Sequence, residues 1–158
     1  MNAEDVLYYG HRTVHGTLDG LSSGDVTQSG ACGVWPVKDI VAHLASFETV
    51  LVDVLRNATG WSGSTDRLAA YLADHEGFND SEVARRSGDT YGQVLAEYDG
   101  AYDEVAKLIR LTQHDLRRQK GWLEWYGAAY DLEDFITYQY YGHKREHCAQ
   151  IAAFQDRP

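Results

Sequence analysis

The sequence predicts an all-α protein, a four-helix bundle with one long crossover connection that carries short helices. Four long stretches repeat apolar residues at intervals of three and four, the spacing of a single buried helix face. No stretch alternates apolar and polar residues with the period of two that is typical of strands. At 158 residues the chain has the length of one domain, so we expect residues 1–158 to form a single helical domain.

The first long helix is expected at residues 3–21, and a polar connection rich in glycine and serine follows at residues 22–35. The second begins at Pro36, because proline suits the first helical position, and it ends near Ala58. The apolar stripes of these helices are Leu7, Val14, Leu18 and Leu21, then Ile40, Leu44, Phe47, Leu51 and Val54. His43 lies on the flank of the second stripe, so its side chain is expected to point into the bundle.

Residues 61–88 form the crossover, with one short helix expected at residues 67–74 and another after a turn at residues 78–81. Asn79 and Asp80 are expected to cap this other short helix. The connection is too long for a tight turn between neighbouring helices, so it is expected to cross the bundle.

The third long helix is expected to begin at Asp89 or Thr90. The last begins after Asp131, a favourable N-cap, with Asp134 in its first turn. Their apolar faces consist of Val94, Leu95, Tyr98, Tyr102, Val105, Leu108 and Ile109, then Ile136, Tyr140, His143, His147, Ile151 and Phe154. Residues 112–131 connect these two helices.

Aromatic residues are concentrated at residues 122–141. Two interpretations remain open, half-buried helix flanks or the wall of a pocket with an apolar surface and polar tips. Trp122, Trp125 and Tyr126 are expected to anchor the connection against the core. Tyr140 is interpreted as a core aromatic residue or, less favoured, as a hydroxyl that orients substrate.

The formal net charge is -10, from 24 acidic and 14 basic residues. Such a surface repels phosphate backbones, so we expect no nucleic-acid partner. No segment approaches the ~18 consecutive apolar residues of a membrane span, and the N-terminus lacks the pattern of a signal peptide. Cys32 and Cys148 stand outside any CxxC motif, which indicates free thiols in a reducing compartment. We therefore expect a cytoplasmic protein with no membrane partner.

His143 and His147 are candidate metal ligands, because a four-residue spacing brings two imidazoles onto one helix face. They continue the apolar stripe of the last helix, and a buried imidazole needs a hydrogen bond or a metal ion. His43 is expected to face them from the second long helix. Three imidazoles leave further coordination positions to water or substrate, which is the pattern of catalytic rather than structural sites.

Other residues near these motifs are weaker candidates for a role in metal binding. His11 and His15 form a second pair at the same spacing, interpreted as a core-edge histidine and a surface residue. The Cys148 side chain is rotated away from the candidate ligands, so it is not expected to bind the ion. Glu146 is expected in a surface ion pair with the adjacent lysine or arginine, or as an acceptor for an imidazole N–H. Glu48 is expected to be solvated or paired.

Three segments, in the expected order along nearly the whole chain, resemble the DinB/YfiT-like superfamily of metalloenzymes. They are Trp35-Pro-Val-Lys-Asp-Ile-Val-Ala-His43-Leu, Phe78-Asn-Asp with the helix around Val94 to Tyr98, and Gly142-His-Lys-Arg-Glu-His147-Cys-Ala-Gln-Ile. The resemblance implies a bundle in which His43, His143 and His147 bind a divalent metal ion such as zinc, nickel or manganese. Ala149 stands where some relatives carry an acidic residue, which leaves no extra carboxylate ligand there. Pro36 replaces the Ser or Thr of many relatives, which affects capping more than chemistry.

Superfamily members with known activity include transferases and isomerases that use low-molecular-weight thiols, and some hydrolases. The resemblance therefore implies a small-molecule metalloenzyme in which the ion activates a thiol or water. A second class remains open, a non-catalytic metal- or ligand-binding bundle with a role in stress or sequestration. We also expect a homodimer, with the helix that carries His11 and His15 as its candidate surface.

Overall fold

The structure is a computed structural model that describes residues 2–157. Its helices are α1 (Ala3–Leu18), α2 (Ser23–Thr27), α3 (Val37–Ala58), α4 (Asp66–Ala73), α5 (His75–Arg85), α6 (Tyr91–Leu111), α7 (His114–Arg117), α8 (Leu132–Thr137), the π-helix η1 (Tyr138–Gly142) and α9 (His143–Gln155). No β-strand occurs within residues 2–157, so the predicted all-α class is confirmed.

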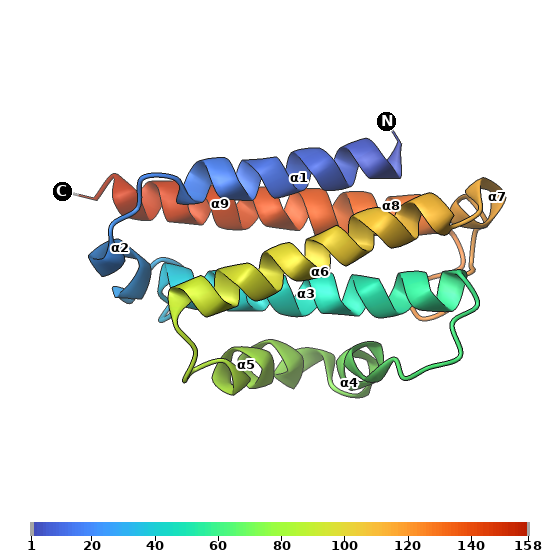
Figure 1. Ribbon diagram of the computed structural model, residues 1–158, viewed down its shortest axis with the longest axis horizontal. Helices are drawn as coiled ribbons and strands as arrows, with labels where there is room; N and C mark the ends of the chain where they lie inside the picture. The colour runs from blue at the N-terminus through green and yellow to red at the C-terminus, as the bar shows by residue number, and fades with distance from the viewer. Residues whose placement is uncertain (1, 158) are drawn as a thin grey trace.

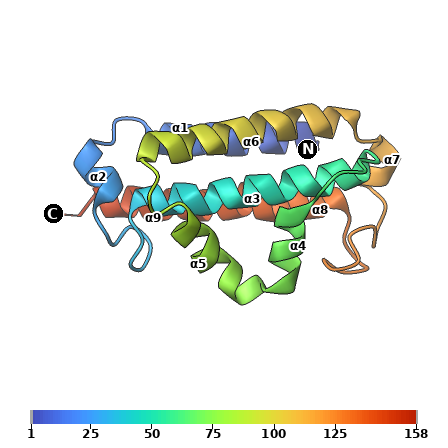
Figure 2. The ribbon, with the colours of Figure 1, turned by 60° about the horizontal axis from the view of Figure 1, so that its bottom comes forward.

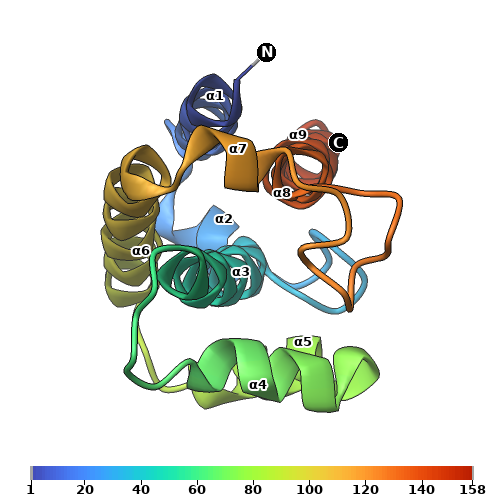
Figure 3. The same cartoon turned by 90° about the vertical axis from the view of Figure 1, so that its right-hand side faces the viewer.

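Four long rods form the bundle, namely α1, α3, α6 and the continuous run α8–η1–α9 (Figure 1). The most extensive helix pairing is α3 with α6, and α1 packs on both α9 and α6. The short helices α4 and α5 form a further layer on the side of α3 that faces away from α1 (Figure 3). Figure 2 shows them opening as a V beside α3. The predicted bundle with a crossover that carries short helices is therefore confirmed.

Apolar side chains from all four rods fill the interior, because each rod turns its apolar stripe inward. Buried members of one part of the core include Leu7, Leu51, Val105 and Ile136, and members of the other include Val14, Ile40, Tyr98 and Ile151. None of the helices within the described chain is long and apolar enough to cross a bilayer.

Capping explains where several helices begin. The Asp131 side chain accepts a hydrogen bond from the backbone N–H of Asp134, and the Asp134 side chain accepts one in return, so the predicted N-cap is confirmed. The Thr90 side chain caps α6 in the same reciprocal way with Gln93. Pro36 is the N-cap residue of α3 rather than its first helical residue, and it has no side-chain cap hydrogen bond.

Two predicted boundaries near the N-terminus differ from the structure. The first helix ends at Leu18 instead of residue 21, before Gly20, whose φ of +80° is easily adopted only by glycine. The connection at residues 22–35 contains the short helix α2, which Ser22 caps and which buries Val26. Val26 is the single apolar residue among the five residues of α2, and that was too weak a signal to predict this turn of helix.

The turn predicted at residues 78–81 is wrong. The Asp74 side chain accepts a hydrogen bond from the N–H of Gly77 and caps α5, so the helix begins earlier and runs through that segment without interruption. Asn79 and Asp80 therefore lie inside the helix and do not cap it.

A π-helical turn, η1, precedes α9 and was not predicted. Its Tyr140 side chain is fully buried, and the hydroxyl donates a hydrogen bond to the carbonyl oxygen of Phe47 at 2.7 Å. On the other side, a Cβ atom added at Gly10 would lie 2.5 Å from the Tyr140 carbonyl oxygen. Glycine thus allows α1 to approach closely, and η1 is held between α1 and α3. π-Turns occur frequently at functional sites, and His143 follows this one directly.

Candidate metal centre

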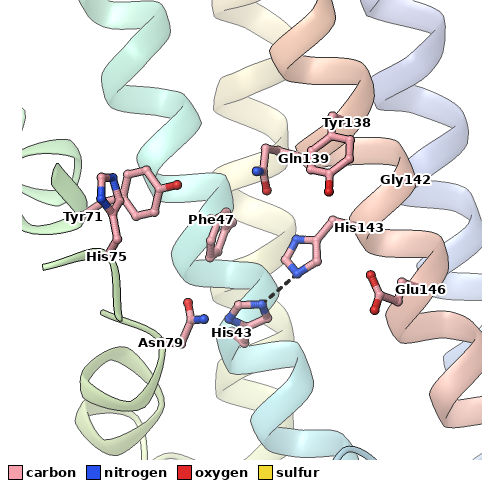
Figure 4. Close-up of a pocket in the computed structure, with 10 residues that line it drawn as sticks. All are labelled: His43, Phe47, Tyr71, His75, Asn79, Tyr138, Gln139, Gly142, His143 and Glu146. Carbon is pink, nitrogen blue, oxygen red and sulfur yellow. Dashed lines mark hydrogen bonds between the residues drawn. The ribbon is translucent and has the colours of Figure 1, made fainter. Parts of the chain in front are cut away.

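Three histidine side chains from two rods meet in the bundle. The Nε2 atom of His143 lies 3.0 Å from Nε2 of His43 and 2.9 Å from Nε2 of His147. Figure 4 shows His43 reaching from α3 toward His143 at the start of α9. Residues 100 positions apart in the sequence are therefore in contact. The structure thus brings together the three residues that the sequence indicated.

Gln150 orients one of these rings. Its side-chain oxygen lies 2.8 Å from Nδ1 of His147, one helical turn away on α9. Since an amide oxygen only accepts hydrogen bonds, Nδ1 carries the proton and Nε2 keeps its lone pair. The ring of His147 is thereby fixed in the tautomer that presents Nε2 to the cluster, as ligand histidines typically require.

Burial keeps the three imidazoles neutral. Desolvation, reinforced by the other two rings, lowers the pKa of His43 from 6.5 to about 3. Desolvation and the neighbouring His147 lower the pKa of His143 to about 4, and desolvation also lowers the pKa of His147. At neutral pH each ring therefore has one nitrogen without a proton. A metal ion can bind there without first displacing a proton from a charged imidazolium.

This donor set fits a divalent transition-metal ion. Nitrogen–zinc bonds of about 2.0–2.1 Å place two ligands of one ion roughly 3.0–3.4 Å apart, close to the separations of 2.9 and 3.0 Å between the Nε2 atoms. Without an ion the three Nε2 atoms cannot all form good hydrogen bonds with one another, because each neutral imidazole has only one N–H to donate. A shared cation would satisfy all three nitrogen lone pairs.

A cavity of about 530 Å³ opens beside two of these histidines. Its lining consists of His43, Phe47, Tyr71, His75, Asn79, Tyr138, Gln139, Gly142, His143 and Glu146. Figure 4 shows Tyr71, His75 and Asn79 on the crossover side, facing His143 and Glu146 across the cavity. The imidazole cluster is thus reachable by a small molecule, and the crossover layer supplies the opposite wall.

The comparison with protein-family models finds one match that covers most of the chain. Residues 9–137 match the mycothiol maleylpyruvate isomerase N-terminal domain. The chain belongs to this family. The family has the DinB/YfiT-like helical fold, so the resemblance noted in the sequence is confirmed. The curated proteins and the solved structures compared with the chain gave no significant match.

The family match and the histidine cluster cover overlapping parts of the site. The matched segment includes His43 and half of the residues that line the cavity, and it ends before His143 and His147. The cluster geometry therefore adds two residues that the family match does not reach. The family membership and the histidine cluster are together compatible with the binding of a divalent metal ion.

A buried ion pair lies next to the cluster. Lys144 follows His143 directly, and its ammonium pairs with the carboxylate of Glu48 on α3. The two side chains are 2% and 0% exposed, so the pair lies in the core. The ammonium also lies 5.3 Å from the ring centroid of Tyr98, a favourable cation–π distance. Of the two expectations for Glu48, pairing is confirmed and solvation is wrong.

Glu146 lies at the edge of the cavity, and both roles predicted for it are wrong. No ion pair of Glu146 occurs within residues 2–157, and the adjacent Lys144 is paired with Glu48 instead. The acceptor for the His147 N–H is Gln150. The Glu146 carboxylate is therefore available at the cavity edge.

The aromatic segment at residues 122–141 belongs mainly to the core. Trp122, Trp125 and Tyr126 pack against the buried core cluster, as predicted for anchors, and Tyr141 packs against it as well. Among the aromatic residues of this segment that the structure describes, Tyr138 alone lines the cavity beside the histidine cluster. None of the three predicted anchors does so. Tyr140 is a core residue, because its hydroxyl is bonded to a backbone carbonyl and cannot orient substrate.

Sequence reasoning missed three neighbours of the cluster. Gln150 had a usable signal, since it stands three residues after His147 and shares its helix face. Tyr71 and His75 had none, because their positions depend on how the crossover folds back over α3. Cys148 is buried among apolar residues and stands outside the ligand cluster, as expected.

Proposed function

We propose that this protein is a metal-dependent enzyme that acts on small molecules at the cluster of His43, His143 and His147. One observation carries the proposal, the convergence of three neutral imidazole nitrogens at the edge of an open cavity. Structural metal sites are closed by four protein ligands, whereas three ligands leave a position for a reactant. Zinc, nickel and manganese are the candidate ions.

The bound ion would lower the pKa of a thiol or water in that open position and so generate a nucleophile at neutral pH. The protein's own residues then divide the remaining tasks. The Asn79 and Gln139 amides line the cavity and can hydrogen-bond polar groups of a substrate. Phe47 and Tyr71 give it an apolar wall. The Glu146 carboxylate can accept the proton that the nucleophile releases.

We propose a low-molecular-weight thiol as the nucleophile, in a transfer or isomerisation reaction. The family description names an enzyme that uses mycothiol, and the cavity has room for part of such a thiol beside an electrophile. Hydrolysis, with water in place of the thiol, is the runner-up reaction.

Metal content of untagged protein tests the site. We expect a tightly bound divalent ion at this cluster, so the metal content should fall by one ion per chain in the His43→Ala and His147→Ala variants. His114→Ala is the matched control, because the His114 side chain is 70% exposed and lies outside the cluster. A metal content that is the same in both cluster variants as in the unmutated protein, or an unmutated protein that binds no ion, contradicts the proposal.

Activity separates an enzyme from a non-catalytic binder. The metal-loaded protein is incubated with mycothiol, bacillithiol or glutathione and an electrophile such as maleylpyruvate, and product formation is measured. Turnover should vanish in His147→Ala and fall in Glu146→Gln, with the metal retained in the latter. A metal-replete protein without turnover on any thiol or ester would favour the binding bundle.

A further inference from the structure

A second cluster of possible metal ligands lies where α1 packs on α6. His11 and His15 stand one turn apart on α1, and Asp99 faces them from α6. The Asp99 Oδ1 atom lies 2.7 Å from Nε2 of His15 and 3.5 Å from Nε2 of His11. All three ligand atoms lie within 4.8 Å of one another.

The two imidazoles of this cluster are arranged like the pair on α9. The ring centroids of His11 and His15 are 4.6 Å apart with an interplanar angle of 57°. The corresponding values for His143 and His147 are 4.6 Å and 61°. The same i, i+4 spacing therefore presents two nitrogens in nearly the same way at both places.

Packing fixes one ligand, and exposure leaves the others accessible. The His11 ring stacks on Tyr102 with centroids 3.7 Å apart and is 17% exposed. Burial, the largest cause, helps to lower the pKa of His11 to about 4, so the ring is neutral at pH 7. The His15 and Asp99 side chains are 40% and 39% exposed. A cavity of about 580 Å³ beside His15 and Tyr91 leaves room for water ligands.

We propose that His11, His15 and Asp99 bind a second divalent transition-metal ion, independently of the first cluster. Two imidazoles and one carboxylate suit zinc and similar ions, whereas magnesium and calcium prefer oxygen ligands alone. The ion would join α1 to α6 through ligands that are 84 positions apart in the sequence. An ordinary hydrogen bond between His15 and Asp99 is the competing explanation.

The test uses the full chain with the first cluster disabled by His43→Ala and His147→Ala. Zinc stoichiometry is measured by isothermal titration calorimetry and by elemental analysis after equilibrium dialysis. We expect one ion per chain in this background, and none after adding His15→Ala or, separately, Asp99→Asn. In the unmutated chain the same two substitutions should lower the stoichiometry from two ions to one.

A matched control is the exposed pair His114 and Asp115, whose Nδ1 and Oδ1 atoms are 3.9 Å apart and which stand outside the ligand clusters. His114→Ala with Asp115→Asn should leave the stoichiometry unchanged. Cobalt titration of the unmutated chain gives a readout that does not depend on the first-cluster substitutions. A second binding event in the visible d–d spectrum, absent in Asp99→Asn, is expected. If zinc and cobalt fill no second site, or fill one that survives both substitutions, the proposal is overturned.

Discussion

At the scale of single residues, the buried pair of Lys144 and Glu48 depends on both charges being present. Each side chain is almost completely removed from water, so removing one partner leaves the other charge uncompensated. Lys144→Met should lower the free energy of unfolding by about 3–5 kcal/mol, measured by urea denaturation of metal-free protein. The double variant Glu48→Leu/Lys144→Met should recover most of that loss. A single variant as stable as the double variant contradicts this account.

The low pKa of His43 predicts acid sensitivity of the metal-free protein. Between pH 6.5 and about 3 the unfolded chain binds a proton at His43 that the folded chain does not. The unfolding free energy should therefore fall as the pH drops below 6.5, by up to about 1.4 kcal/mol per pH unit for this residue, and His43 should contribute no slope above pH 6.5. Denaturation curves at several pH values check this.

A His43→Leu variant is the control for that pH dependence. Carboxylates also titrate below pH 5, and their contribution is common to both proteins. The wild-type curve should be steeper than the variant curve between pH 6.5 and 4. Parallel curves would show that the folded and unfolded chains bind protons equally at this position.

The candidate site was only partly visible at the residue scale. Spacing placed His143 and His147 on one face, and the apolar stripe turned His43 inward, so the cluster could be predicted. Asp99 could not be connected with His11, because that contact depends on the angle at which α6 crosses α1.

At the scale of helices, the close approach of α1 to η1 predicts opposite effects for two glycines. Gly10→Ala would place a Cβ atom 2.5 Å from the Tyr140 carbonyl oxygen, so one backbone must shift. We expect a loss of about 1–3 kcal/mol in unfolding free energy. Because η1 leads into His143, a displaced η1 should also weaken metal binding.

Gly16→Ala on the same helix is the matched control. A Cβ atom there would meet nothing within 4 Å, and alanine is the better helix former, so stability should rise by up to about 1 kcal/mol. Thermal unfolding and metal titration of both variants provide the comparison. Equal effects of the two substitutions would contradict a steric role for Gly10.

The long helices were predictable because each one buries a stripe that the sequence displays directly. The π-turn was not, since the run at residues 138–142 keeps an apolar spacing that an ordinary α-helix also explains. The start of α5 was missed because Asn79 and Asp80 resemble caps, whereas Asp74 performs the capping. Local capping signals compete within a few residues, and tertiary packing decides between them.

At the scale of the whole molecule, one arginine ties the crossover layer to the bundle. The Arg86 side chain is 2% exposed, and its guanidinium donates two hydrogen bonds to the carboxylate of Glu97 on α6, at 2.7 and 2.6 Å. It also donates to the carboxylate of Glu82 on α5 at 2.9 Å. The pKa of Glu82 is lowered despite its burial, because arginines bond to its charged form. The layer that carries Tyr71 and Asn79 is therefore anchored through a buried network.

Arg86→Met should release this layer and leave the metal centre in place, since the three histidines belong to α3 and α9. We expect a loss of about 3–5 kcal/mol in unfolding free energy and faster amide hydrogen exchange in α4 and α5. Metal stoichiometry should be unchanged, while KM for the small-molecule substrate rises, because the cavity loses its crossover wall.

Arg85→Met separates this anchoring from a general loss of positive charge. Arg85 also bonds to Glu82, but its side chain is 52% exposed, so the substitution should cost less than about 1 kcal/mol. Exchange rates in α4 and KM should stay near their original values. If Arg85→Met and Arg86→Met act alike, or if Arg86→Met also releases the metal ion, then the crossover layer and the histidine cluster are one cooperative unit. In that case the division between a metal-holding bundle and a substrate-holding crossover is wrong.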